Sequence, residues 1–166
     1  MKLFMKMKKC VRTIVRILLV LYTLVLLYLM FVKDRGGILS GVSLGEYVKE
    51  MSNFVPFQTI GTYVSALWNG TMNRIIILKN LVGNLVLFMP FAYFLYFFTK
   101  MKLKKMIVLT IIILLVLEML QLFTRSGAFD VDDFILNLAG AIVIYWFLWR
   151  KTGSEKDVSV SGIGEG

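Results

Sequence analysis

The sequence predicts an all-α integral membrane protein with four transmembrane helices and with both termini on the cytoplasmic side. Three observations lead to this fold class. The chain has 166 residues, of which 58% are hydrophobic, and its mean hydropathy is +0.79. Four apolar windows approach the length of about 20 residues that a helix needs to cross a bilayer. Lysine and arginine gather in three regions that an even number of spans places on one side. These properties fit one membrane domain rather than a soluble protein.

The four windows are residues 14–32, 81–98, 106–123 and 134–149. Lysines precede the first window, as they do in a signal peptide, but no small-x-small cleavage site follows it. We therefore expect an uncleaved anchor. The fourth window is short, so its span is expected either to begin earlier or to use Trp146 and Trp149 as interfacial anchors. Pro90 lies inside the second window, where we expect it to kink the helix.

Basic residues set the predicted orientation. The chain has 19 Lys and Arg against 10 Asp and Glu, which gives a formal net charge of +9. The excess lies in the N-terminal segment, in the 99–105 loop between spans two and three, and at Arg150 and Lys151. Because an excess of Lys and Arg marks cytoplasmic loops, these regions are predicted inside, and the acidic loop between spans three and four outside. Anionic membrane lipids are their expected partners, and nucleic acid is not.

The one long connection, residues 33–79, is too apolar to be a simple linker. Apolar residues recur at helical spacing twice, at positions 44, 47, 48 and 51 and at positions 60, 63, 64 and 67. We predict two short amphipathic helices that lie on the outer leaflet, the second beginning after Pro56. They are expected to cover and anchor the spans, and the alternative role is a lid or a lipid-recognition surface. Residues 1–150 are predicted to form the membrane domain, and the Gly- and Ser-rich residues 151–166 a disordered cytoplasmic tail.

Polar residues in and beside three of the spans share the predicted outer membrane face. The candidate site residues are Asn80, Asn84, Glu118, Gln121, Arg125, Asp130, Asp133 and Asn137. The three on span three have the spacing i, i+3 and i+7, which predicts that they share one helix face, and the three that begin span four repeat this spacing. The first of these, Asp130, is expected to cap the fourth helix, with Asp132 and Asp133 in its first turn, where carboxylates are favourable.

Two interpretations of this set remain open. Hydrogen bonds between polar side chains hold membrane helices together at roughly 0.6 kcal/mol each, so the set could be purely structural. Glu118 favours a functional polar cavity instead, because it follows the apolar run 106–117, and an acid at the centre of a span costs about 2.5–3.5 kcal/mol. The expected partners of Glu118 are Asn84, Gln121 or Arg125.

The residue content limits the chemistry. The sequence has no histidine and one cysteine, Cys10, which removes Cys/His zinc sites, Ser-His triads and histidine proton relays. No catalytic motif is recognised, and neither a cofactor nor a metal site is predicted. The carboxylates could still bind a hard cation or act as general acid and base. With Arg125 and the asparagines, they could instead hold a polar headgroup at the lipid interface.

At these residues the chain resembles the VanZ-like family. The family pattern has an asparagine followed by F-x-P-F, then E-x-x-Q, then D-x-x-D-x-x-x-N-x-x-G. Over about residues 10–150, the chain matches this pattern at Asn84, Phe88, Pro90, Phe91, Glu118, Gln121, Asp130, Asp133, Asn137 and Gly140. An upstream N-x-x-P-F element is matched at Asn53, Pro56 and Phe57.

The resemblance implies a multi-pass protein of the bacterial cytoplasmic membrane. Some members of the family lower susceptibility to teicoplanin-type lipoglycopeptides, which act outside that membrane. The leading hypothesis is an outward-facing polar pocket that binds a lipid-linked envelope component or a lipoglycopeptide and lowers teicoplanin susceptibility. The alternatives are an outer-leaflet enzyme that uses carboxylates to modify a lipid or an envelope glycan, and a structural or partner-binding membrane subunit. The sequence predicts no oligomeric state.

Overall fold

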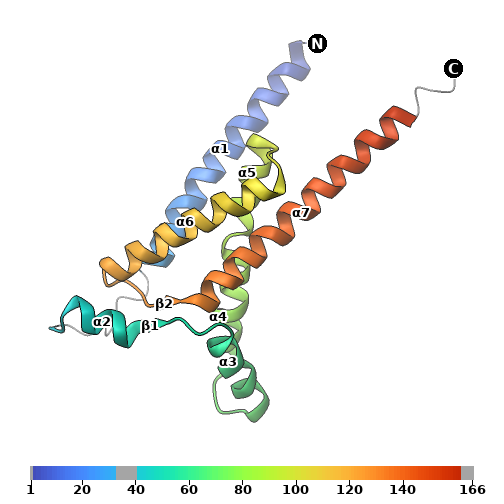
Figure 1. The fold of residues 1–166 in the computed structure, drawn as a ribbon. Coiled ribbons are helices and arrows are strands. Elements are labelled where there is room, and N and C mark those ends of the chain that lie inside the picture. Colours follow the sequence, from blue (N-terminus) through green and yellow to red (C-terminus); the bar gives the residue numbers. More distant parts are fainter. Residues whose placement is uncertain (1, 33–40, 162–166) are drawn as a thin grey trace. The chain divides into compact units, whose positions relative to one another are not determined.

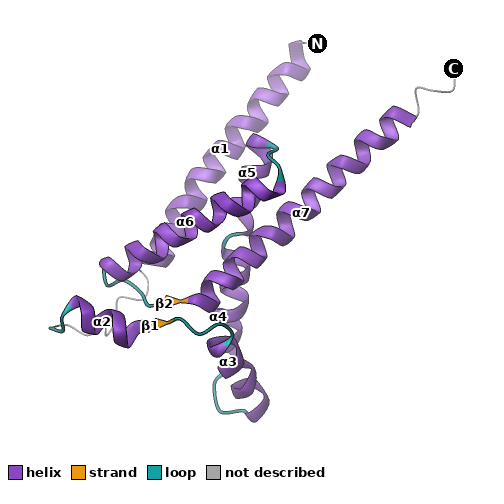
Figure 2. Cartoon of the chain, viewed as in Figure 1, coloured by secondary structure: helices purple, strands orange, loops and turns teal. Residues whose placement is uncertain are grey.

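The structure is a computed structural model that describes residues 2–32 and 41–161 (Figure 1). It is 81% helical. Helices predominate and there is almost no sheet, as Figure 2 shows. In chain order the elements are α1 (Lys2–Phe31), α2 (Leu44–Met51), β1 (Ser52–Asn53), α3 (Gln58–Asn69), α4 (Arg74–Leu87), α5 (Met89–Thr99), α6 (Leu103–Phe123), β2 (Phe129–Asp130) and α7 (Val131–Ser161).

Four stretches of the described helices are long and apolar enough to cross a membrane. They are Lys9–Phe31, Arg74–Thr99, Leu103–Phe123 and Val131–Lys151. The prediction of an all-α protein with four spans is confirmed, and the side on which each terminus lies stays a prediction. The second span begins at Arg74 rather than at residue 81. The reason is a cap, because the Asn73 side chain accepts a hydrogen bond from the Ile75 backbone N–H at 2.8 Å.

The second span consists of two helices, α4 and α5, which meet at Phe88. Pro90 has no backbone N–H, so it cannot donate the helical hydrogen bond to the Val86 carbonyl. The Phe88 N–H bonds to that carbonyl instead and tightens the turn. The Phe88 side chain is fully buried. The interruption expected at Pro90 is therefore present, as a break that falls just before the proline.

The two short helices predicted in the 33–79 segment are present as α2 and α3. A capping box starts α2, because the Ser43 side chain accepts from the Glu46 N–H and the Glu46 carboxylate accepts from the Ser43 N–H. That backbone N–H lowers the pKa of the Glu46 carboxyl. α3 begins after Pro56 and ends at Gly70, whose φ of +66° is the left-handed conformation that favours glycine. Residues 33–40 lie outside the described residues.

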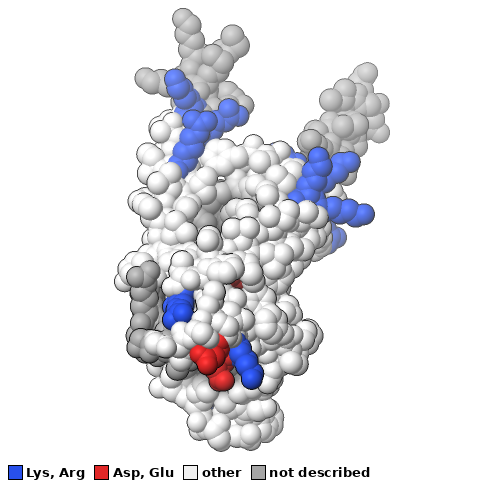
Figure 3. All heavy atoms as spheres, turned by 60° about the vertical axis from the view of Figure 1, so that its left-hand side comes forward, with Lys and Arg blue, Asp and Glu red and all other residues white. Residues whose placement is uncertain are grey.

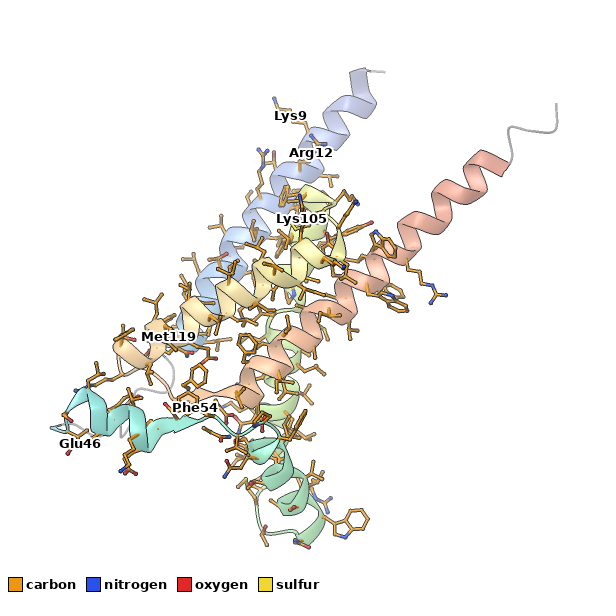
Figure 4. All side chains as sticks on the ribbon, in the orientation of Figure 1. Lys9, Arg12, Glu46, Phe54, Lys105 and Met119 are labelled. Atoms are coloured by element: carbon orange, nitrogen blue, oxygen red, sulfur yellow. The ribbon has the colours of Figure 1, made fainter. Side chains whose placement is uncertain are left out.

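The chain divides into two compact units, and each is described by itself. Unit 1 contains Met1–Phe54 and Val116–Phe129, and unit 2 contains Val55–Leu115 and Asp130–Gly166. α6 therefore begins in unit 2 and ends in unit 1. Lys105, near its start, and Met119, near its end, mark the two portions in Figure 4.

Unit 1 has a small apolar core that covers one face of α2. Tyr47 of α2, Leu122 near the end of α6 and Phe129 of β2 are buried together. Strand β1 pairs with β2 beside this core. Phe54, which follows β1, packs on Phe129 with the ring centroids 5.1 Å apart. The core thus holds α2 against the end of the third span.

Unit 2 is built on the close packing of α4 and α5 against α7. A Cβ atom added to Gly140 of α7 would lie 1.7 Å from the Leu85 carbonyl oxygen of α4, so the two backbones can approach this closely only at glycine. Further along α7, the Tyr145 ring packs edge-on against Tyr96 of α5 at 5.2 Å. The Tyr145 hydroxyl donates to the Met101 carbonyl at 2.6 Å. α7 is therefore fastened to both helices of the second span.

Acidic and basic side chains lie at opposite ends of the α7 span in unit 2. The first turn of α7 carries Asp132 and Asp133, whereas Arg150 lies near the other end of the span. The Lys100 ammonium lies 4.0 Å above the Tyr96 ring, in the part of α5 that packs on the far half of α7. Figure 3 shows basic side chains gathered toward the later part of α7, and other basic side chains beside acidic ones elsewhere on the face in view.

The residues after Lys151, which the sequence predicts to be a disordered tail, continue α7 as a helix to Ser161. Residues 162–166 lie outside the described residues. The last span ends at Lys151, next to the predicted domain boundary at residue 150.

Candidate functional site

The polar cluster at the start of α7 is centred on Asp133. The side-chain amide of Asn84, on α4, donates a hydrogen bond to Asp133 Oδ1. One turn further along α7, the Asn137 amide donates to the backbone carbonyl of Asp133 at 2.8 Å. Asn84 and Asp133 are 49 positions apart in the sequence, so only the packing of α4 on α7 brings them together.

Helix α3 adds two hydroxyl groups to this cluster. Thr59 Oγ1 donates to Asp130 Oδ2 at 2.6 Å, and Asn80 Nδ2 donates to Tyr63 Oη at 2.9 Å. Burial raises the pKa of the Tyr63 phenol, and the carboxylates of Asp133 and Asp130 raise it further, whereas the Asn80 hydrogen bond lowers it. Tyr63 therefore keeps its proton at neutral pH and can donate a hydrogen bond.

Asp132 fastens α3 to α7. Its side chain is fully buried, with Oδ1 accepting from the Phe57 N–H at 2.5 Å and Oδ2 from the Ile60 N–H at 2.9 Å. Phe57 has a φ of +66° and caps α3 without a side-chain hydrogen bond. The carboxylate of Asp132 takes that place, where backbone N–H groups lack helical partners and negative charge is favourable. Asp130 caps α7 as predicted, because its Oδ1 accepts from the Asp132 N–H at 2.9 Å.

Asn137 is the most enclosed of the predicted site residues, with 2% of its surface exposed. Its Oδ1 atom has no hydrogen-bond partner among the residues that the structure describes. Buried polar atoms are normally paired. Gly140, which contacts Leu85, lies one turn further along the same helix. A further hydrogen-bond donor at Asn137 Oδ1 would therefore be favourable.

The predicted site residues of α6 belong to unit 1. Glu118 is buried, with 4% of its surface exposed. The Gln121 amide donates to the Met30 carbonyl, at the end of α1, at 2.8 Å. The last carbonyls of a helix have no intrahelical donor, so this bond caps α1 and joins it to α6. Gln121 therefore serves as a structural contact between helices, which is the first of the two interpretations left open by the sequence.

Arg125 does not share a helix face with Glu118 and Gln121, and the sequence prediction is wrong at this point. α6 ends before Arg125, which has a φ of +53°. The Ser126 N–H bonds to the Gln121 carbonyl at 2.9 Å and closes the helix end. The Arg125 guanidinium carbon lies 5.8 Å from the centroid of the Tyr47 ring, within cation–π range. The spacing i+7 implies a shared face only where the helix continues.

Tyr47 offers a test of the packing in unit 1. Its buried hydroxyl donates to the Gly127 carbonyl at 2.7 Å, and burial raises the pKa of the phenol, although Arg125 opposes the shift. We expect Tyr47→Phe to lower the free energy of unfolding by about 0.5–1.5 kcal/mol, because the carbonyl loses its donor. Unfolding of the purified protein in detergent measures this loss. Tyr28→Phe, at an exposed site on α1, is the control, and equal stability of both variants would contradict the assignment.

The structure gathers five of the eight predicted site residues in unit 2. They are Asn80, Asn84, Asp130, Asp133 and Asn137. The meeting of these residues with Glu118 stays a prediction. Sequence reasoning did not place Thr59, Tyr63 and Asp132 in the cluster. Asp132 could have been found from the sequence, because three acidic residues lie close together where the fourth span begins. For Thr59 and Tyr63 the sequence indicated only that they belong to an amphipathic helix.

The described side chains, at 9–32 and 41–151, contain no group of three or more His, Cys, Asp or Glu placed to hold a metal ion. The acids at the start of α7 have other partners. Asp130 accepts from Thr59 and from the α7 backbone, and Asp132 accepts from the α3 backbone. The cluster is therefore a hydrogen-bonding arrangement, with one carboxylate that faces an asparagine amide.

The four long apolar helices and the polar cluster beside them define a multi-span helical membrane protein with an ordered polar site. The model of the VanZ/LLP1 family matches residues 19–152, and the chain belongs to that family. The resemblance stated from the motifs is confirmed. Comparison with curated proteins and with solved structures gives no match.

The motifs of the family resemblance correspond to the contacts described above. The N-x-x-P-F element leads from β1 to the start of α3, where Asp132 binds the backbone. The F-x-P-F element forms the break between α4 and α5. The D-x-x-D-x-x-x-N-x-x-G element runs along α7 from its cap, Asp130, to the Gly140 contact with Leu85. These motifs therefore link α3, α4 and α7 in this protein.

Proposed function

We propose that this VanZ-family membrane protein binds the polar headgroup of an amphiphile in the cluster around Asp133. The ligand is a lipid-linked envelope component or a lipoglycopeptide, which share a headgroup rich in hydroxyls and amides and an apolar hydrocarbon tail. The site faces outward from the bacterial cytoplasmic membrane, and capture of the ligand there lowers teicoplanin susceptibility.

The contact between Asn84 and Asp133 is the observation that carries this proposal. The Asn84 amide binds Oδ1 of the carboxylate, so Oδ2 can accept a hydrogen bond from a ligand hydroxyl or amide. Tyr63, which keeps its proton, can donate one, and the Asn137 Oδ1 atom can accept another. A mixed set of donors and acceptors at the end of a span suits an uncharged or zwitterionic headgroup.

The distribution of charge in unit 2 supports the outward orientation. The 99–105 loop carries four lysines and is tied to the far half of α7 by the Tyr145–Met101 hydrogen bond. Arg150 lies in the same half of α7. Basic loops remain on the cytoplasmic side, so the opposite end, with Asp133, is assigned to the outside.

The enzymatic alternative has less support. It requires Glu118, Asp130 and Asp133 as acid, base or cation ligands. Asp130 instead serves as the cap of α7 and as the acceptor for Thr59. Binding of a headgroup does not require Asp130 as an acid, a base or a cation ligand, and we therefore prefer it.

Removal of the Asp133 charge tests the proposal directly. In Asp133→Asn the side-chain carbonyl can still accept from Asn84, so the fold is retained while a charge-assisted acceptor is lost. We expect binding of teicoplanin, or of a lipid-linked envelope precursor, to purified protein in nanodiscs to weaken about 10- to 100-fold. Native mass spectrometry of protein purified from untreated cells shows whether a lipid-linked envelope component is bound, because a lipoglycopeptide is present only when it is added.

Susceptibility assays provide the cellular test. A strain that carries Asp133→Asn should match a strain without the protein in its response to teicoplanin, at equal membrane abundance. Glu50→Gln, an exposed acid on α2, is the matched control and should behave like the unchanged protein. Glu118→Gln reports whether unit 1 contributes to the same pocket. Full retention of binding and phenotype in the Asp133 variant would contradict the proposal. Turnover of a lipid by the purified protein would favour the enzymatic alternative. Co-purification of one protein partner in stoichiometric amount would favour a structural or partner-binding subunit.

A further inference from the structure

The helices α3 and α4 form a hairpin that is held firmly at its base. The hairpin is defined here as residues 58–79. The backbone N–H groups of Phe57 and Ile60 donate to Asp132, and these two bonds, with the Thr59–Asp130 bond, fix the start of α3 to α7. The Tyr63–Asn80 bond joins α3 to α4. The turn at Gly70 and the Asn73 cap define its tip. The tip therefore has a defined position relative to the polar cluster.

The tip is apolar, exposed and basic. Trp68 has 90% of its surface exposed and Ile75 has 73%, and they are accompanied by further exposed residues. These are Val64, Leu67, Ile76 and Leu78. The hairpin contains no Asp or Glu, and its only charged residues, Arg74 and Lys79, are both exposed. An apolar surface of this extent with two cations is unfavourable in water, but it complements a lipid surface with anionic headgroups.

The length of the helices sets the depth of the hairpin. The α7 span, Val131–Lys151, has 21 residues and is about 32 Å long, enough to cross the hydrocarbon. The Asn84–Asp133 contact places Asn84 at the level of the first turn of α7. The second span, Arg74–Thr99, has 26 residues and is about 39 Å long as a helix, about 9 Å more than the hydrocarbon thickness. The start of this span, with the tip of the hairpin beside it, therefore reaches the level of the lipid headgroups.

We propose that the hairpin docks on the anionic lipid surface next to the protein, with Trp68 inserted at the boundary between headgroups and acyl chains. Tryptophan favours this boundary because its ring is apolar and its N–H can reach a polar partner. Arg74 and Lys79 bind the phosphates of anionic headgroups. Docking holds the Asp133 cluster at the level where an amphiphile's headgroup lies. This inference requires the membrane location of the four spans and is independent of the ligand proposed above.

Fluorescence of Trp68 in the full chain tests the insertion. The protein has three tryptophans, so Trp146→Phe and Trp149→Phe together leave Trp68 as the single emitter. This variant is reconstituted in vesicles of equal parts phosphatidylcholine and phosphatidylglycerol. We expect lipids brominated near the carbonyl end of the acyl chain to quench Trp68 strongly, and lipids brominated near the chain terminus to quench it weakly. Acrylamide in the water should quench it less than it quenches free tryptophan.

The role of the two cations is tested with the same emitter. Quenching should be stronger when phosphatidylglycerol carries the bromine than when phosphatidylcholine carries it. Removing each cation should lower this preference about fivefold, so Arg74→Gln with Lys79→Gln should abolish it. Lys104→Gln with Lys105→Gln, which removes two charges from the opposite end of unit 2, is the matched control and should leave it unchanged.

Two outcomes would overturn the proposal. Quenching by acrylamide equal to that of free tryptophan, without quenching by brominated lipid, would place Trp68 in water. Protection from both quenchers would indicate a protein partner, and formation of a disulfide-linked dimer by the Trp68→Cys, Cys10→Ser variant would identify a second copy of the chain. Circular dichroism of each variant shows whether the helices are retained.

Discussion

Replacing Gly140 with alanine is expected to separate α4 from α7 and to lower the free energy of unfolding strongly. The added Cβ would lie 1.7 Å from the Leu85 carbonyl oxygen and 2.9 Å from its carbon. Both are backbone atoms, so no side-chain rotation can relieve the clash. Overpacking typically costs about 1–3 kcal/mol, and we expect the upper end or more here. Thermal unfolding of the purified protein in detergent measures the loss.

Gly83→Ala provides a matched control for this prediction. Gly83 lies on α4, close to Leu85, but a Cβ added there meets nothing within 4 Å. Alanine is favoured over glycine inside a helix by about 0.5–1 kcal/mol, so this variant should be equally stable or more stable. Equal stability of the two variants would show that α4 and α7 do not meet at Gly140. The Asn84–Asp133 contact would then also be in doubt, because it depends on the same packing.

Asp132→Asn is expected to release α3 from α7. The two carboxylate oxygens accept from two separate backbone N–H groups, those of Phe57 and Ile60. An amide retains one oxygen and turns an NH₂ group toward the other N–H, so one donor loses its acceptor and faces another donor. Losing one charge-assisted hydrogen bond of this kind costs about 1.5–3 kcal/mol. Hydrogen exchange of the α3 backbone should increase, while exchange in α6 should not.

Comparison with Asp130 sharpens this test. Asp130→Asn removes the same charge from a neighbouring position, where Oδ2 accepts from the Thr59 hydroxyl and Oδ1 from the α7 backbone. The Thr59 hydroxyl can rotate and accept from the new amide, so we expect a smaller effect on α3. If the α3 amides exchange as slowly in both variants as in the unchanged protein, the carboxylate of Asp132 does not hold α3 in place.

Most of the fold could be predicted from local sequence properties. The spans follow from apolar length, because a helix satisfies its own backbone within a bilayer. The short helices α2 and α3 follow from the spacing of their apolar residues and from Pro56. The main differences lie at helix ends. α4 begins earlier because Asn73 caps it, and α6 ends before Arg125 because the chain turns there. The position of a helix end depends on single hydrogen bonds, and the spacing of apolar residues does not predict these bonds.

The candidate site was predictable in part. The polar residues of α4 and α7 were identified because polar groups inside apolar spans are costly, and Asn84 and Asp133 do meet. Two other residues were assigned to the same site and have local roles in unit 1. Gln121 caps the end of α1, and Arg125 lies over the Tyr47 ring. Asp132 was recognised only as a first-turn acid, because its partners are backbone groups that carry no sequence signal.

By itself, the sequence determined the membrane class, the number of spans, the VanZ/LLP1 family and the polar residues that a bilayer would not accept without a partner. These follow from composition, length and motif order, which act locally along the chain. The tertiary structure decided which polar groups are partners, because Asn84, Tyr63 and Asp133 come from three helices that meet only through packing. It also decided that Gly140 is required, since the distance between two backbones is a property of the folded chain alone.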